Sequence, residues 1–216
     1  MFAALSDGNP VVLKHLKKFL AVGPVAYVYH QSSTVMALLA DAKLQYLLDI
    51  FNINEFLGEN WLITNFGSAF CALFGKLCDD FVAAIADMDA SRDNYERYDV
   101  VAGHDPSGTS VLNMVHWEQL TFVDNFQKYD YGTDENMKIY GQPTPPLYNL
   151  GNITHEVHLF AGDEDMLADP TDVQRLKDEM VNATVHFHEY SKVGHITFLW
   201  GVDMNYVSDM IEVLRS

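Results

Sequence analysis

The chain has 216 residues, of which 49% are hydrophobic and 20% are charged, a balance typical of a folded domain with a sizeable core. Its 13 basic and 30 acidic residues leave a formal net charge of −17, which disfavours binding to nucleic acid and to anionic membrane surfaces. The longest apolar run, residues 19–29, is too short to span a membrane and is broken by Gly23 and Pro24, so we expect no integral membrane segment.

Residues 1–30 predict short helices followed by a buried strand. Residues 2–5 and 11–16 are typical of short apolar helices, and the dense apolar run 19–29 is typical of a strand buried on both faces. Neither an N-cap residue nor a secretory signal sequence precedes the first helix. We therefore expect that the chain continues from a preceding segment of a longer protein, and that residues 1–30 are a remnant of an α/β core.

Residues 31–148 predict a helical insertion. Apolar side chains recur there at three- and four-residue steps, without the two-residue alternation of a strand. The insertion ends in a proline-rich return at residues 142–148. The helical spacing is carried by Val35, Leu38, Leu39, Leu44, Leu47, Leu48, Phe51, Phe70, Leu73, Leu77, Phe81, Val82, Val111, Val115, Leu120 and Val123.

The α/β pattern resumes in residues 149–216, which form the second part of the predicted core. Two strands alternate with two helices, at residues 157–161 (strand), 171–180 (helix), 184–190 (strand) and 202–214 (helix). The sequence therefore predicts an α/β fold, with the last strands of a parallel sheet and a helical cap inserted between the two parts of the core.

Asp165 and His195 follow the two strands predicted in residues 149–216, thirty positions apart (195 − 165). Loops at the carboxyl edge of a parallel sheet converge on one crevice, so we expect these two side chains to meet there. In hydrolases of this architecture the triad follows the chain order serine, acid, histidine. We expect Asp165 to accept a hydrogen bond from one ring nitrogen of His195, and His195 to act as general base and then general acid.

The nucleophile of such a triad is absent from the chain. The serine of these enzymes stands in a G-x-S-x-G turn, and the sequence contains no such turn. Ser110 follows Gly108 but has Leu112 where the second glycine belongs, and Ser107 has Asp105 in place of the first. The sequence therefore predicts an acid and a base without their nucleophile.

Two metal sites are alternatives to this interpretation. Asp163, Glu164 and Asp169 lie close to Asp165 and suggest a calcium loop, but their spacing lacks the EF-hand pattern, and Asp169 is better explained as a helix N-cap. His186 and His188 project from one strand face as two potential zinc ligands. No third ligand has motif spacing, so a solvated strand face is favoured. We expect neither a metal nor a cofactor.

Four stretches of the chain resemble the acid lipase family, which includes lysosomal acid and gastric lipases. Residues 104–117 contain HDPSGTSVLN and then HW, similar to the family's H-x-P-x-G-T-S-x-x-N and H-W. Residues 162–169, GDEDMLAD, resemble its G-x-D-x-L-A-D at the triad acid with one extra residue, and residues 195–201, HITFLWG, resemble H-x-x-F-x-W-G at the triad histidine. Residues 145–149, PPLYN, resemble the return from cap to core, so the resemblance covers nearly the whole chain.

This resemblance implies an α/β-hydrolase whose parent protein cleaves acylglycerols or sterol esters, without a cofactor, through an acyl-serine intermediate. Asp165 and His195 carry over as triad acid and base, whereas Ser107 and Ser110 belong to the cap motif. The elbow serine is implied directly upstream of Met1, so we expect the isolated chain to be inactive. The family also implies a lysosomal or secreted parent protein.

Several features leave alternatives open. Cys71 and Cys78 bridge if the compartment is oxidising, although two reduced thiols on one helix face are about equally compatible, and their spacing is closer than that of the family's cap cysteines. The sequons at Asn152 and Asn182 agree with a secretory route. The oligomeric state stays open.

The apolar side chains of the cap suit a neutral lipid ester or a lipid interface, or else are plain core packing. Rival functions are a non-catalytic lipid-binding or interaction protein, and an esterase, thioesterase or acyltransferase on the same scaffold. The cap residues considered are Met36, Leu39, Phe51, Phe56, Phe70 and Phe74.

Overall fold

The computed structural model describes residues 1–34, 36–37, 55–56, 69, 71–89, 91–101, 104 and 108–216. Several predicted positions therefore lie outside the described residues, namely Val35, Leu38, Leu39, Leu44, Leu47, Leu48, Phe51, Phe70, Asp105 and Ser107. None of the described helices is long and apolar enough to cross a membrane.

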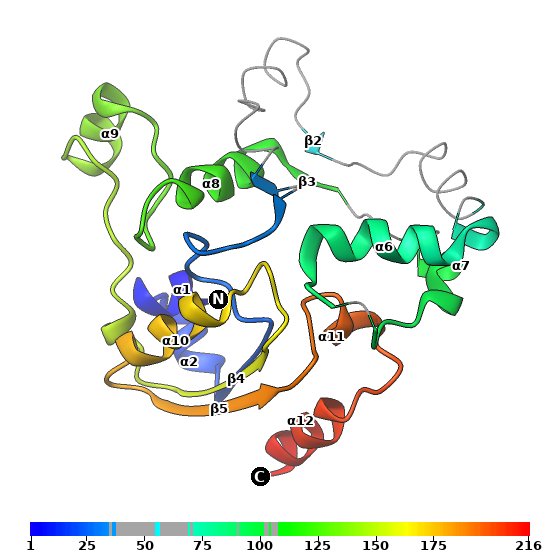
Figure 1. Ribbon diagram of the computed structural model, residues 1–216. Coiled ribbons are helices and arrows are strands. Elements are labelled where there is room, and N and C mark those ends of the chain that lie inside the picture. The colour runs from blue at the N-terminus through cyan, green and yellow to red at the C-terminus, as the bar shows by residue number, and fades with distance from the viewer. Residues whose placement is uncertain are drawn as a thin grey trace.

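Three parallel strands form the sheet, in the order β1, β4, β5 (Figure 1). β1 (Lys18–Val22) and β5 (Thr184–Tyr190) both pair with the central strand β4 (Glu156–Gly162). The first residue of β4, Glu156, faces Lys18 on one side and Thr184 on the other. The predicted α/β class with a partial parallel sheet is therefore confirmed.

Helices cover both faces of this sheet, and β4 is therefore buried on both of its sides. On one face, α1 (Phe2–Ser6) and α10 (Pro170–Glu179) pack against Val157 and Leu159, with α2 (Pro10–His15) alongside. On the other face, α12 (Tyr206–Arg215) packs against Phe160 and Tyr190. Two short helical turns precede and follow these strands, η2 (Leu150–Asn152) and α11 (Thr197–Trp200).

The predicted start of α10 is confirmed. The Asp169 side chain accepts a hydrogen bond from the Thr171 backbone nitrogen at 2.8 Å, and Pro170 occupies the first helical turn. An N-cap carboxylate satisfies an otherwise unpaired amide at the helix start, and proline fits a position that has no intrahelical partner. Asp169 is therefore a structural residue.

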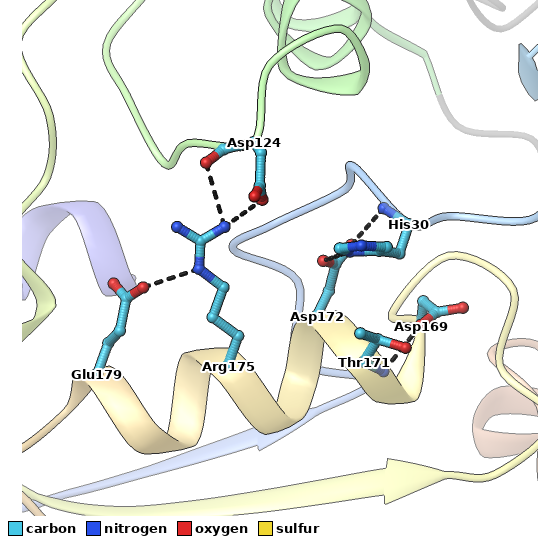
Figure 2. Close-up of polar contacts among 7 residues, drawn as sticks. All are labelled: His30, Asp124, Asp169, Thr171, Asp172, Arg175 and Glu179. Atoms are coloured by element: carbon cyan, nitrogen blue, oxygen red, sulfur yellow. Dashed lines mark hydrogen bonds and ion pairs between the residues drawn. The ribbon is translucent and has the colours of Figure 1, made fainter.

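Figure 2 shows how α10 is tied to two distant segments. Asp172 accepts hydrogen bonds from the backbone nitrogen of His30, at 2.9 Å, and from its Nδ1 in the matching tautomer, at 2.7 Å. Arg175 donates from Nε to Glu179 at 2.8 Å, and its Nη1 contacts the carbonyl and the carboxylate of Asp124 (Figure 2). The helix thereby connects the segment after β1 to the loop after α8 (Val111–Thr121).

β1 ends at Val22, seven residues earlier than the end of the predicted strand (29 − 22). Gly23 has φ +54°, a left-handed conformation that interrupts a strand. Tyr27 and Val28 are nevertheless buried, in irregular backbone rather than in the sheet. The strand prediction for 19–29 was wrong at its carboxyl end, because burial alone made the apolar run look continuous.

The inserted region is mainly helical where it is described, with α6 (Gly75–Ala86), η1 (Tyr95–Arg97), α7 (Tyr98–Val101), α8 and α9 (Thr133–Tyr140). It is not all helical as predicted, since β2 (Glu55–Phe56) pairs antiparallel with β3 (Thr109–Ser110). Each of these strands has only two residues, which is too short for an alternating pattern to predict it. The division at residues 30 and 148 stays a prediction.

Cys71 and Cys78 form a disulfide bond. Both residues are buried, in a small cluster with Tyr98 of α7. The sequence left open whether the cysteines are oxidised or reduced, and in the structure they are oxidised. The disulfide links Cys78 of α6 to Cys71, which precedes that helix.

Candidate active site

Asp165 and His195 meet at the carboxyl edge of the sheet, as predicted. Asp165 lies in the loop after β4 and His195 in the loop after β5, and these strands are neighbours. Nδ1 of His195 lies 2.9 Å from Oδ2 of Asp165. The expected juxtaposition of the carboxylate and the imidazole is therefore confirmed.

The Asp165 carboxylate is held rigidly and is fully buried. Its Oδ1 accepts hydrogen bonds from the backbone nitrogens of Leu167, at 2.9 Å, and Ala168, at 2.7 Å. These two bonds leave Oδ2 directed at the imidazole, so one oxygen fixes the loop and the other orients the ring.

The environment of His195 favours the protonated ring. Burial lowers the pKa of the imidazole, because an apolar surrounding disfavours its charge. The hydrogen bond and charge of Asp165, together with the charge of Asp87, outweigh this effect and raise the pKa of His195 above its usual value. Such a ring can accept a proton and hold it beside a buried carboxylate.

Gly23 leaves the space in which this pair stands. A Cβ atom at position 23 would lie 2.9 Å from both Cε1 and Nδ1 of His195, and 3.5 Å from Oδ2 of Asp165. Its positive φ also favours glycine. The sequence identified Gly23 only as a break in an apolar run, and nothing in the spacing pointed to the close approach.

Asp87, directly after α6, braces the histidine loop from the side of the inserted region. Its carboxylate accepts hydrogen bonds from the backbone nitrogens of Ile196, at 2.9 Å, and Thr197, at 3.2 Å. Thr197 in turn donates its hydroxyl to Asp93 at 2.7 Å. Gly194 permits this contact, because a Cβ there would lie 2.2 Å from the Asp87 carboxyl carbon.

The same segment also pairs with the acid loop. The Met88 nitrogen donates to the Glu164 carbonyl, and the Met166 nitrogen donates to the Ala86 carbonyl, each at 2.9 Å. One short stretch of the inserted region therefore contacts both loops of the Asp165–His195 pair. The sequence did not single out Asp87, because its partners lie more than a hundred positions away.

Asp87 is unusually basic for a carboxyl group. Burial raises its pKa to about 6, with further contributions from the nearby carboxylates of Asp93 and Asp165. The two backbone amides oppose this shift, because they stabilise the charged form. Asp87 therefore changes charge in the same mildly acidic range in which an ordinary histidine titrates.

A cavity of about 560 Å³ opens beside the His195 ring. Residues 1–3 and the expected cap residue Met36 line it, together with α8. Its apolar walls include Val28, Trp117, Leu120, Phe126 and Leu167. This volume and lining suit a small apolar ligand or part of a longer one.

The remaining predicted residues lie elsewhere. Ser110 caps α8, accepting a hydrogen bond from the Asn113 nitrogen at 3.2 Å, so its position fits the non-nucleophilic role expected for it. Asp163 accepts from the Lys192 nitrogen at 2.5 Å. In the described part of the chain, no serine hydroxyl is hydrogen-bonded to the His195 ring.

The acidic residues around Asp165 do not gather around a common point. Among the described residues, a group of three or more ligating side chains converges only at Glu156, His158 and His186. The calcium hypothesis for the residues around Asp165 therefore has no support in the described part of the chain. His186 and His188 do share one strand face as expected, but two residues of β4 join them.

A parallel sheet that carries an Asp–His pair at its carboxyl edge, with a helical region above, defines a protein of the α/β-hydrolase class. No protein-family model matches the chain. Lipase lipl-1 of Caenorhabditis elegans is 33% identical over 209 residues, and gastric triacylglycerol lipase of Mus musculus is 34% identical over 205 residues. Each alignment covers 94% of this chain, and 52% and 51% of the respective relative.

Human lysosomal acid lipase/cholesteryl ester hydrolase is 32% identical over 197 residues, with 90% of this chain and 49% of that protein covered. Among solved structures, an α/β hydrolase fold protein from Nakamurella multipartita covers 99% of this chain and is itself covered to 64%, with a TM-score of 0.44 and 14% identity. The chain belongs to the acid lipase family, and it spans about half the length of the curated relatives that it matches.

Proposed function

We propose that this chain supplies the acid and the base of a lipase whose triad is completed by a serine from a preceding segment. The observation that carries the proposal is the 2.9 Å contact between His195 Nδ1 and the buried, doubly anchored carboxylate of Asp165. In this role His195 takes the serine proton through Nε2, while Asp165 holds the tautomer and stabilises the imidazolium. The proton then passes to the leaving alcohol.

The isolated chain is proposed to have no ester turnover. Among the described residues no serine hydroxyl is hydrogen-bonded to His195, so the histidine has no nucleophile to activate there. Losing a triad serine costs several orders of magnitude in rate. Residues 1–3 line the same cavity as His195, so a segment joined ahead of Met1 would begin beside this cavity.

The test compares the isolated chain with a fusion. A segment that carries the G-x-S-x-G turn, taken from human lysosomal acid lipase, is joined ahead of Met1, and both proteins are treated with a fluorophosphonate probe and a triacylglycerol emulsion. We expect labelling and turnover only in the fusion. Serine labelling of the isolated chain would refute the proposed inactivity.

Paired substitutions in the fusion test the proposed roles. Asp165→Asn is expected to lower kcat about 10⁴-fold, because an amide stabilises the wrong histidine tautomer. Asp169→Asn is the matched control, since asparagine caps a helix as well as aspartate does and the residue only caps α10. Equal activity of the two variants would remove Asp165 from the triad.

A neutral lipid ester is the proposed substrate class. The apolar cavity beside His195 can recover the free energy of dehydrating an acyl chain. On α6 and just before it, Leu73, Leu77 and Phe81 are 78%, 57% and 65% exposed, and this apolar surface favours contact with a lipid interface. Leu77→Glu is expected to weaken binding to triacylglycerol emulsions but to leave turnover of a soluble short-chain ester unchanged.

A non-catalytic lipid-binding protein is the second candidate, and the apolar cavity favours it as well. A titration of the isolated chain with a fluorescent long-chain fatty acid separates the two. Tight binding by a stable monomer supports the binding protein, whereas an aggregated or unfolded chain supports the fragment of an enzyme. An acyltransferase on the same scaffold would transfer the acyl group to an added alcohol in the fusion assay.

A lysosomal or secreted parent protein is proposed on three observations. Two relatives are a gastric and a lysosomal lipase by name, the two cysteines form a disulfide, and both sequon asparagines, Asn152 and Asn182, are exposed. Expression of the full-length parent through the secretory pathway of a eukaryotic cell tests this. A mass shift removed by an endoglycosidase is expected, and its absence at both sites would count against the assignment.

A further inference from the structure

A cluster of histidines occupies the sheet face that packs against α12. The register pairs His158 of β4 with His186 of β5, and Glu156 lies two positions before His158 on the same face. His158 is buried, whereas the His186 and Glu156 side chains are 48% and 34% exposed. The cluster therefore has an interior end and an end open to solvent.

The donor atoms of this cluster converge. Oε1 of Glu156 lies 2.9 Å from Nε2 of His158 and 3.9 Å from Nε2 of His186, and one donor atom of each residue lies within 4.8 Å of the others. Two ligands of a tetrahedral zinc ion are about 3.3 Å apart, so the observed separations bracket that value. The rings of His158 and His186 are stacked, with centroids 4.4 Å apart and an interplanar angle of 14°. His186 therefore has to turn out of this stack before both Nε2 atoms can point at one ion, and its exposure allows that turn.

The surroundings suit a metal ligand. His188 Nε2 lies 3.1 Å from Nδ1 of His158, so that Nδ1 can donate its proton there and Nε2 of His158 is left for a metal. Outer-sphere hydrogen bonds of this kind orient ligating histidines. Lys18 lies 3.6 Å from Glu156, but it also contacts the Ser216 hydroxyl at 2.7 Å, so it keeps an acceptor when Glu156 turns to a cation.

We propose that Glu156, His158 and His186 bind a divalent cation of the zinc class. Two imidazoles and one carboxylate are a donor set that Zn²⁺ accepts, with a water in the fourth position, whereas Mg²⁺ and Ca²⁺ prefer oxygen ligands alone. The cation replaces the proton between His158 and Glu156.

This site is separate from the Asp165–His195 pair. Glu156 is the first residue of β4 and Asp165 follows its last, and the six steps from Glu156 to Gly162 alone extend roughly 20 Å. Metal binding therefore stands or falls independently of the proposed lipase function. A three-ligand site on two adjacent strands, with one end open to solvent, fits the role of holding β4 and β5 together.

The test is calorimetric titration of the 216-residue chain, expressed without a polyhistidine tag, with Zn²⁺ alone and with Mg²⁺ alone. We expect one equivalent of Zn²⁺ to bind and to raise the Tm, and Mg²⁺ to do neither. His186→Ala is expected to weaken Zn²⁺ binding at least 100-fold, and His188→Ala about 10- to 100-fold, because the latter removes only the outer hydrogen bond.

His15→Ala is the matched control, since His15 is an exposed histidine on α2, outside the cluster. It is expected to bind Zn²⁺ as the unmodified chain does. Equal weakening by His15→Ala and His186→Ala would mean scattered surface binding and would overturn the proposal, as would the absence of any Zn²⁺ binding. Because His186 is exposed, its replacement is compatible with folding, and far-ultraviolet circular dichroism checks this.

Discussion

Replacing Gly23 by alanine tests whether the space beside His195 is as tight as the structure indicates. A residue with a Cβ in the left-handed region costs about 1–2 kcal/mol. The new methyl group would also lie 2.9 Å from Cε1 and Nδ1 of His195, so the ring has to move away from Asp165. Losing a hydrogen bond to a charged group costs about 1.5–3 kcal/mol. Gly23→Ala is therefore expected to lower the free energy of unfolding by about 2.5–5 kcal/mol.

Gly8→Ala separates the backbone cost from the contact. Gly8 has φ +67°, yet a Cβ there meets nothing within 4 Å, so its replacement is expected to cost only about 1–2 kcal/mol. The assay is urea denaturation together with NMR titration of the histidine rings. In Gly23→Ala the pKa of His195 is expected to fall, because burial remains while the bond to Asp165 is lost. An unchanged His195 pKa, or equal destabilisation by both variants, would refute the reasoning.

Three further predictions concern Asp87, the disulfide bond and the contacts of α10. The folded-state pKa of Asp87, about 6, lies above the ordinary value of 3.8, so the folded protein binds more protons than the unfolded chain between these pH values. The stability due to Asp87 is therefore lost as the pH rises through about 6. From pH 4 to pH 7 the free energy of unfolding of the unmodified chain should therefore fall by about 2.4 kcal/mol relative to Asp87→Asn, as measured by urea denaturation, whereas parallel pH profiles would contradict the assignment. Cys78→Ser removes the disulfide to Cys71 and is expected to cost about 2–3 kcal/mol in thermal unfolding under oxidising conditions, with no difference after reduction. Arg175→Met keeps most of the side-chain volume but removes the contacts to Glu179 and Asp124, and urea denaturation should show a loss of about 1 kcal/mol that disappears at high salt.

The sequence predicted those parts of the site that follow local rules. Asp165 and His195 come after strands marked by apolar runs, and the cap at Asp169 has a local signature, so their placement needed no long-range information. Gly23, in contrast, lies in a run of buried apolar residues that continues past the strand, and burial does not distinguish sheet from irregular backbone.

Contacts between residues far apart in the chain could not be predicted from the sequence. Asp87 accepts hydrogen bonds from Ile196 and Thr197, which lie 109 and 110 positions later in the chain. No spacing pattern encodes such a pairing. The sequence has no third zinc ligand at motif spacing from His186 and His188. His158 and Glu156 come from the neighbouring strand and reach His186 only through the register of β4 with β5.

The attachment of the segment 86–88 to both loops has a consequence for protein engineering. Ala86 and Met88 pair with the acid loop through backbone groups, and the Asp87 carboxylate pairs with the histidine loop. A design that replaces the inserted region of this fold with a foreign one therefore has to retain residues 86–88. A cut at Ala86, where α6 ends, would remove Asp87 and Met88. The contacts that hold the loops of His195 and Asp165 beside each other would then be lost.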